Sequence, residues 1–230
     1  MLEGALVRGE VVVQAGLRVL QAVEHSGAYL LADEIYAGAE RETDDVTSTF
    51  YGRHDRVISA GSMSKSYGLP GLRVGWLVGP ADLISQLWTR HEYLTLSTAI
   101  LSNHHLAPLA LRPDVREQIF ARTRRYIRNG WTNYEPWLKE NEDILGLVSP
   151  QASAISLVRY NLNMDSVTLV NRLIREKSVL IGPGDYFGVP NHIRISYGLP
   201  PDYLNPGLER IADFLRQVAA EEGSSTAAGA

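Results

Sequence analysis

The chain has 230 residues, of which 45% are apolar and 21% charged, a composition that excludes collagen-like, disordered and coiled-coil classes. Its net charge of −4 argues against nucleic-acid binding, and the lack of cysteine excludes disulfides, thiolate zinc sites and a cysteine nucleophile. No apolar run approaches the roughly 18 residues of a membrane span and no signal-peptide pattern opens the chain, so we expect a cytoplasmic protein without membrane partners.

The sequence pattern of the first half of the chain predicts short apolar strands between helices. Apolar residues from Leu6 to Val23 recur at helical spacing, which predicts an amphipathic helix. Two short apolar runs, at 28–32 and 56–60, each end in polar residues and suit strands buried on both faces of a parallel sheet. A third strand is expected over 73–78, and a helix follows over 80–93.

The second half predicts longer helices and a second group of strands. Helices are expected over 99–111, 113–141, 166–177 and 202–220, and strands over 145–149, 154–160, 179–181 and 192–197. Gly130 is a weak point in the second of these helices. The arginines Arg122, Arg124, Arg125 and Arg128 in the same helix read as a solvated face. The pattern predicts an α/β open-sheet part over 1–110, a smaller α+β domain over 111–221 and a flexible tail over 222–230.

The densest polar cluster runs from Ser62 to Gly75, just after the second strand, where open α/β sheets place ligands. The hydroxyls of Ser62 and Ser64, the Arg73 guanidinium and several glycines suit a dianionic phosphate. Lys65 lies among them and is the one group able to form an imine. A phosphate site with an embedded lysine predicts pyridoxal 5'-phosphate, a phosphorylated aldehyde.

A second cluster, at the end of the first strand, supports the same cofactor. The Asp33 carboxylate can pair with a protonated pyridine nitrogen, and Tyr36 can bond the ring hydroxyl. Ile35 between them can pack on the ring. Asp33 and Glu34 could also form a metal-binding pair, but no histidine lies nearby, so we predict no metal.

These residues resemble the fold-type I pyridoxal-phosphate enzymes, in particular the class I/II aminotransferases. The spacing Ser62-x-Ser64-Lys65-x-x-Gly68-x-x-Gly71-x-Arg73-x-Gly75 is similar to the family's cofactor-attachment signature, and Asp33-Glu34-Ile35-Tyr36 to its upstream element. Pro183-Gly184, Phe187-Gly188 and His192–Ser196 resemble the C-terminal element. The resemblance implies the C-terminal part of the large open-sheet cofactor domain, followed by the small α+β domain.

The resemblance also implies a reaction and roles for its residues. Lys65 would form the Schiff base with pyridoxal phosphate and then act as the base, with Asp33 at the ring nitrogen and Tyr36 at the ring hydroxyl. Ser62, Ser64 and Arg73 would hold the phosphate, and Arg194 would bind the substrate's α-carboxylate. The implied enzyme is a homodimer that transfers an amino group between an α-amino acid and a 2-oxo acid.

The family's upstream half has no counterpart in this sequence. Its glycine-containing phosphate turn, ring-stacking aromatic and Asn-Pro-rich segment are not found, so the chain resembles a family member cut just before Gly4. Two alternatives therefore stay open. One is a pyridoxal-phosphate lyase, cyclase or oxidase acting on an amino acid in secondary metabolism, and the other is a truncated, non-catalytic fragment of such an enzyme.

Overall fold

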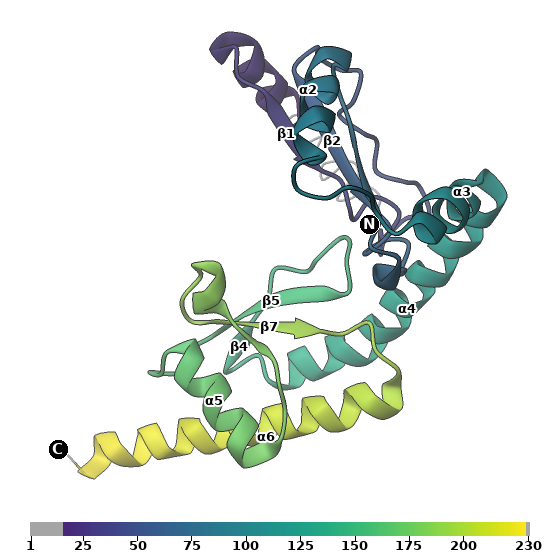
Figure 1. Cartoon of the computed structure of the whole chain (residues 1–230). Helices are drawn as coiled ribbons and strands as arrows, with labels where there is room; N and C mark the ends of the chain where they lie inside the picture. Colours follow the sequence, from purple (N-terminus) through teal and green to yellow (C-terminus); the bar gives the residue numbers. More distant parts are fainter. Residues whose placement is uncertain (1–15, 229–230) are drawn as a thin grey trace. The chain divides into compact units, whose positions relative to one another are not determined.

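The computed structural model describes residues 16–228, which form two compact units (Figure 1). Unit 1 comprises the chain up to Gly38 together with Val46–Phe120, and unit 2 comprises Ala39–Asp45 together with the chain from Ala121 onward. The two units are not separated by a single boundary such as residue 110. Ala39–Asp45, from the first half of the chain, belongs to unit 2. Residues 16–26 are helical as expected, whereas Leu6, Val12 and Val13 of the predicted first helix lie outside the described residues.

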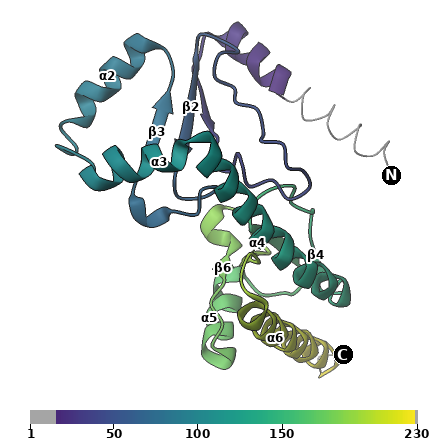
Figure 2. The same ribbon diagram turned by 90° about the vertical axis from the view of Figure 1, so that its right-hand side faces the viewer.

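Unit 1 is built on a three-stranded sheet in the order β1 (Leu30–Asp33), β2 (Val57–Ser62) and β3 (Gly75–Val78). All three predicted strands are present. β1 and β2 are parallel, whereas β3, which lies beside β2 (Figure 2), runs antiparallel to it. The chain returns directly after the polar cluster without a crossover helix, which a parallel pairing would need. The expectation that the first strand is buried on both faces is wrong, since Leu31 is 64% exposed.

Besides the helix at residues 16–26, unit 1 contains α2 (Ala81–His91), α3 (Ala107–Leu111) and the first two turns of α4 (Pro113–Glu140). The helix expected over 99–111 contains a π-helical segment, Ser102–Leu106, just before Pro108. Proline has no N–H and crowds the carbonyl four residues earlier, which favours the wider turn. The core of this unit consists of Met63, Tyr67, Val74, Ala107, Ala110 and Phe120.

Unit 2 contains an antiparallel sheet in the order β4 (Leu145–Gly146), β5 (Ile155–Tyr160), β7 (His192–Ser196) and β6 (Gly182–Pro183). The strand expected over 145–149 is shorter than predicted, and the one expected over 179–181 is displaced to β6. The displacement follows from Ser178, which ends α5 (Ser166–Lys177) in the left-handed conformation with φ 55°. Pairing with β7 then begins at Gly182.

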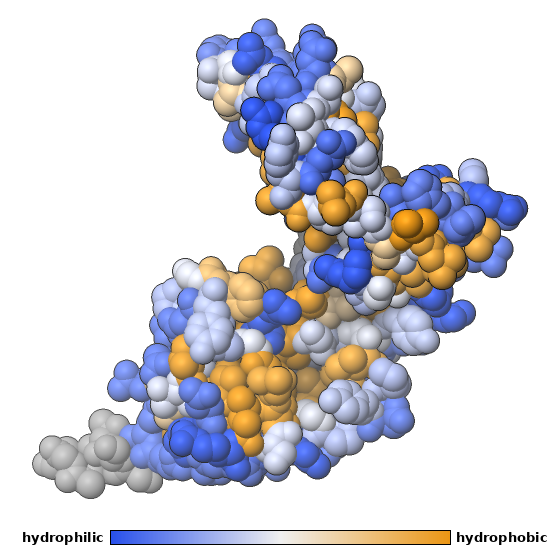
Figure 3. All heavy atoms as spheres, in the orientation of Figure 1, coloured by the Kyte–Doolittle hydropathy of each residue, from blue (hydrophilic) through white to orange (hydrophobic). Residues whose placement is uncertain are grey.

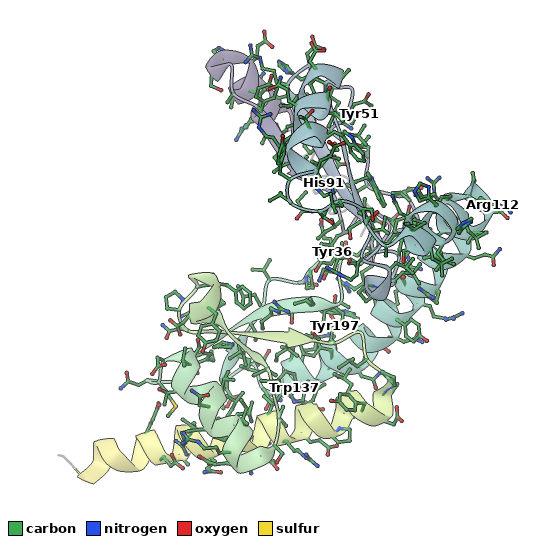
Figure 4. The ribbon with its side chains drawn as sticks, in the orientation of Figure 1. Tyr36, Tyr51, His91, Arg112, Trp137 and Tyr197 are labelled. Carbon is green, nitrogen blue, oxygen red and sulfur yellow. The ribbon has the colours of Figure 1, made fainter. Side chains whose placement is uncertain are left out.

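One face of this sheet packs on the helices α4, α5 and α6 (Pro201–Ala228). Alternate residues of β5 and β7 point inward, and aromatic residues of α4 fill the space beside them. The rings of Tyr134 and Tyr197 are stacked with centroids 5.2 Å apart, and Trp137 Nε1 donates to the Leu208 carbonyl (2.9 Å). Trp137 and Tyr197 are both buried between the sheet and the helices (Figure 4).

The last helix is longer than the sequence predicts. α6 continues to Ala228, so most of the segment expected as a tail over 222–230 is helical. Two contacts hold α6 where this extension begins: Arg172 of α5 donates to the Glu221 carboxylate (2.9 Å), and Glu222 accepts from the Asn163 N–H (2.9 Å). No helix within residues 16–228 combines the length and apolarity that a membrane crossing requires.

Segment 39–45 is held on unit 2 by the arginines of α4. Glu40 and Arg124 form a buried ion pair (2.6 Å), and Arg128 donates to the Arg41 and Thr43 carbonyls (2.8 and 2.9 Å). The Arg41 guanidinium lies 4.0 Å from the centroid of the Trp131 ring. The prediction that the arginine run is a solvated face is therefore wrong for Arg124, because its carboxylate partner comes from a distant part of the chain.

We expect alkaline pH to destabilise unit 2 through its buried phenols. Burial raises the pKa of Tyr160 and of Tyr197 to about 12, and it raises that of Tyr134 further. An unfolded tyrosine titrates near pH 10, so the unfolded state loses these protons first. The contribution to stability is complete below pH 10 and is lost as pH rises to about 12. Urea titrations at increasing pH test this, with phenolate absorbance reporting ionisation; a free energy of unfolding that stays constant over this range would contradict it.

Candidate active site

The ends of the three strands of unit 1 bring the two predicted clusters to one edge of the sheet. β1 ends at Asp33 and β2 ends at Ser62, and because β3 is antiparallel, its first residue, Gly75, lies at the same edge. Asp33 pairs with Ala60 in the register of β1 and β2. The polar cluster and the acidic strand end therefore meet where α/β sheets place ligands.

The loop that carries Lys65 is anchored by apolar neighbours on both sides of it. Met63 and Tyr67 are buried in the core of unit 1, and the Tyr67 ring makes edge contacts with Phe120 (5.0 Å) and Trp76 (6.0 Å). Gly68, at φ 63°, closes the turn by donating its N–H to the Lys65 carbonyl (2.8 Å). Lys65 itself is exposed, and its Nζ makes no hydrogen bond or ion pair with the residues that the structure describes.

A backbone hydrogen bond joins the lysine loop to the turn after β1. The Ser66 N–H donates to the Ile35 carbonyl (3.3 Å), and the Ile35 N–H donates to Asp33 Oδ1 (3.2 Å). Tyr36 lies in the same turn (Figure 4) and is half-buried. Residues about thirty positions apart in sequence are thus fixed side by side within unit 1.

The predicted phosphate ligands differ in their surroundings. Ser62 Oγ accepts from the Ser64 N–H (3.0 Å) and donates weakly to the Val74 carbonyl (3.4 Å), so it orders the loop. Arg73 is exposed and adopts φ 55°, with one guanidinium N–H donated to the Pro70 carbonyl (2.9 Å). A bulky residue in the left-handed region is strained, and such strain is concentrated at functional sites.

Arg194 belongs to unit 2, on the outward face of β7. Its direct cross-strand neighbours are Leu157 of β5 and Gly182 of β6. The guanidinium carbon of Arg194 lies 5.0 Å from the centroid of the Phe187 ring. The other predicted site residues, Asp33, Ile35, Tyr36, Ser62, Ser64, Lys65 and Arg73, all lie in unit 1.

Sequence reasoning missed the support that Glu34 gives to this edge. Its carboxylate accepts from the Phe50 N–H (2.7 Å) and from Ser59 Oγ (3.0 Å), which fixes the polar loop between β1 and β2. A cavity of about 410 Å³ borders Glu34 and Trp76, but Asp33, Lys65 and Arg73 are not among its lining residues. The sequence indicates this role of Glu34 only through its position next to Asp33. Neighbouring residues of an extended segment point to opposite faces, so the two carboxylates point in opposite directions.

The donor set of unit 1 fits pyridoxal 5'-phosphate group by group. Lys65 has the amine that an aldehyde would need, Arg73 and the serines have donors that would suit a phosphate, and Asp33 has a carboxylate that would suit a ring nitrogen. Tyr36 has a phenol that would suit the ring hydroxyl. Among residues 16–228, no three histidine, aspartate or glutamate side chains gather as a metal site would require.

The chain is similar to known proteins over most of its length. Residues 9–211 match the family described as aminotransferase class I and II. The capreomycidine synthase of Streptomyces vinaceus is 34% identical over 161 residues, which are 70% of this chain and 41% of that protein. Nicotianamine aminotransferase B of Hordeum vulgare is 26% identical over 211 residues, covering 87% of this chain and 38% of that protein.

Solved structures show the same fold. A pyridoxal-phosphate-dependent aminotransferase from Streptococcus suis has a TM-score of 0.78 at 25% identity, covering 87% of this chain and 52% of that one. The α-aminoadipate aminotransferase LysN from Thermus thermophilus has a TM-score of 0.81 at 23% identity, covering 90% and 55%.

The chain folds into an α/β unit and a small α+β unit, which is the fold class that the sequence predicts. The chain belongs to the class I and II aminotransferase family, whose members are enzymes, and this membership implies pyridoxal phosphate as the cofactor. It spans about half, or less, of the length of the relatives described above.

Proposed function

We propose that the chain serves pyridoxal-phosphate-dependent transfer of an amino group between an α-amino acid and a 2-oxo acid. The observation that carries the proposal is the hydrogen bond from the Ser66 N–H to the Ile35 carbonyl, which joins the lysine loop to the turn with Asp33 and Tyr36. When bound, the cofactor supplies an electron sink for the charge that develops at the substrate's Cα. A homodimer is the proposed assembly.

Lys65 is the proposed point of covalent attachment and the proposed base. Its Nζ is exposed and has no partner among the described residues, so it is available to the aldehyde. Once a substrate amine has replaced it, the same Nζ can remove the proton from the substrate's Cα and return it on the cofactor side. The turn closed by Gly68 and the buried Met63 and Tyr67 hold the lysine in place for both roles.

The remaining proposed roles follow from charge and hydrogen-bonding capacity. Asp33, at the end of β1, keeps the ring nitrogen protonated, and the Tyr36 phenol bonds the ring hydroxyl. Ile35 packs on the ring, while Ser62, Ser64 and Arg73 hold the phosphate. The Arg194 guanidinium takes the substrate's α-carboxylate through two parallel N–H···O bonds.

A second candidate is favoured by the relative with 34% identity, which is named a synthase rather than an aminotransferase. The same Lys65 and Asp33 would serve a lyase, cyclase or oxidase that acts on an amino acid, because these reactions also use the cofactor as a sink for charge that develops on the substrate. The two candidates differ in the fate of the amino nitrogen. Transfer requires a 2-oxo acid acceptor, whereas the alternative reactions do not.

Product analysis with a ¹⁵N-labelled amino acid separates these candidates. The chain is incubated with pyridoxal phosphate and a panel of labelled amino acids, with and without a 2-oxo acid acceptor. We expect the label in a new amino acid, formed together with the donor's 2-oxo acid and only when the acceptor is present. Labelled product without an acceptor would favour the second candidate. Failure of the chain to take up the cofactor at all, read from its absorbance, would support the non-catalytic fragment.

A further inference from the structure

We propose that Phe187 is a positioning residue that holds the Arg194 guanidinium ready for a carboxylate ligand. The inference deepens the proposed function and rests on it, because it assumes that Arg194 binds the substrate's α-carboxylate. It concerns unit 2 alone, since both residues and everything that holds them belong to that unit.

The contact between the two side chains is a cation–π interaction. The guanidinium carbon of Arg194 lies over the Phe187 ring, 5.0 Å from its centroid, within the roughly 6 Å over which such contacts attract. Among the described residues, no hydrogen bond or ion pair to the Arg194 side chain is present. Because the contact with the ring uses none of the guanidinium N–H groups in a hydrogen bond, these groups stay available to a carboxylate.

Gly182 leaves the space in which these two side chains meet. It pairs with Arg194 across β6 and β7, and a Cβ at this position would lie 3.1 Å from Arg194 Cβ and 3.5 Å from Phe187 Cε2. A Cβ here would crowd the Arg194 Cβ and would be in ordinary van der Waals contact with the Phe187 ring. The lack of a side chain at Gly182 of β6 thus allows the Phe187 ring to lie close to the Arg194 guanidinium.

The short helix that carries Phe187, η3 (Gly184–Phe187), is fixed from its other side. The Asp185 N–H donates to Ser166 Oγ (3.0 Å), and the Asp185 carboxylate accepts from the Ser166 N–H (3.0 Å) and hydroxyl. Gly188, at φ 69°, ends the helix by donating its N–H to the Asp185 carbonyl (3.1 Å). The ring of Phe187 is therefore placed by its own helix and not by burial.

Phe187 is 49% exposed, so its ring contributes little to the core of unit 2. Losing the ring would return rotamer freedom to Arg194, and a carboxylate would have to order the side chain on binding. An exposed cation–π contact of this kind corresponds to a change of about two- to fivefold in a binding constant.

Chemical protection of Arg194 measures this effect without cofactor or turnover. Phenylglyoxal modifies arginine side chains in the full chain, and mass spectrometry of the peptides gives the rate at each one. The carboxylate probe is 4-methylpentanoate, whose half-protecting concentration at Arg194 is compared between wild type and variants. Arg175, exposed on α5 of the same unit, is the internal reference.

We expect Phe187→Leu to raise the half-protecting concentration at Arg194 about two- to fivefold, with no change at Arg175. Phe187→Tyr, which keeps a ring, should retain the wild-type value. Equal protection of Arg194 in Phe187→Leu and wild type would overturn the positioning role, as would an equal shift at Arg175. If the probe does not protect Arg194 in the wild-type chain, the proposed role of Arg194 itself fails, which is a distinguishable result.

Discussion

Replacement of Lys65 by alanine is expected to abolish covalent attachment of pyridoxal phosphate and to lower the rate of amino-group transfer by roughly 10²- to 10⁴-fold, the usual effect of losing a general base. The reason is that no neighbouring group can substitute for this amine. The chain has two other lysines, Lys139 and Lys177, and both belong to unit 2. The loop itself should keep its fold, because Met63 and Tyr67 anchor it independently of the exposed lysine.

Borohydride reduction followed by peptide mapping checks the attachment directly. The pyridoxyl group should be found on the peptide that contains Lys65 in the wild-type chain and on no peptide of Lys65→Ala. Lys139→Ala is the matched control, since this lysine is on the surface of α4 and has only a distant ion pair with Glu135 (3.8 Å). A Lys65→Ala chain that still carried a reducible adduct, or that kept its rate, would refute the assignment.

Replacement of Gly130 by alanine is expected to destabilise unit 2 by about 2–3 kcal/mol, within the range for overpacked cores. A Cβ at this position in α4 would lie 1.9 Å from the Tyr197 carbonyl oxygen and 2.8 Å from the carbonyl carbon. The Tyr197 backbone cannot retreat easily, because its N–H donates to the Ala154 carbonyl (2.8 Å) and its phenol donates to the Ser153 carbonyl. The clash outweighs the better helix propensity of alanine, which is about 1 kcal/mol.

Gly207 of α6 provides the matched control, because a Cβ there would meet nothing within 4 Å. Gly207→Ala should stabilise the chain by up to about 1 kcal/mol, through helix propensity alone. Urea denaturation followed by tryptophan fluorescence gives the two free energies of unfolding, with Trp76 and Trp88 replaced by phenylalanine in every chain so that only Trp131 and Trp137 of unit 2 report. If the two substitutions changed stability in the same direction, close packing at Gly130 would be disproved.

The residues of the lysine loop and the acidic strand end could be predicted from the sequence because their geometry is local. The spacing from Ser62 to Gly75 encodes a tight turn after a strand, and Asp33 closes the neighbouring strand, so topology alone brings the clusters together. The reversal of β3 was not predicted, since the pattern of a short apolar strand does not indicate its direction.

Features that depend on a distant partner could not be predicted in this way. Gly130 reads as a weak point in a helix until the Tyr197 carbonyl is placed against it. The sequence predicts a solvated Arg124 because its partner Glu40 is 84 positions earlier and only the folded structure brings the two together. The contact between Phe187 and Arg194 depends on the pairing of β6 with β7, and the periodicity of the sequence carries no trace of that register.

The attachment of segment 39–45 to unit 2 means that this unit is built from two separate segments of the chain. A fragment that starts at Ala121 would keep Arg124 but lose Glu40, so a guanidinium suited to a buried site would be left without its counter-ion. Removing one partner of a buried pair costs about 3–5 kcal/mol, a large part of the stability of a small domain. Dissection of the chain into its units therefore calls for a graft or circular permutation that carries the segment along.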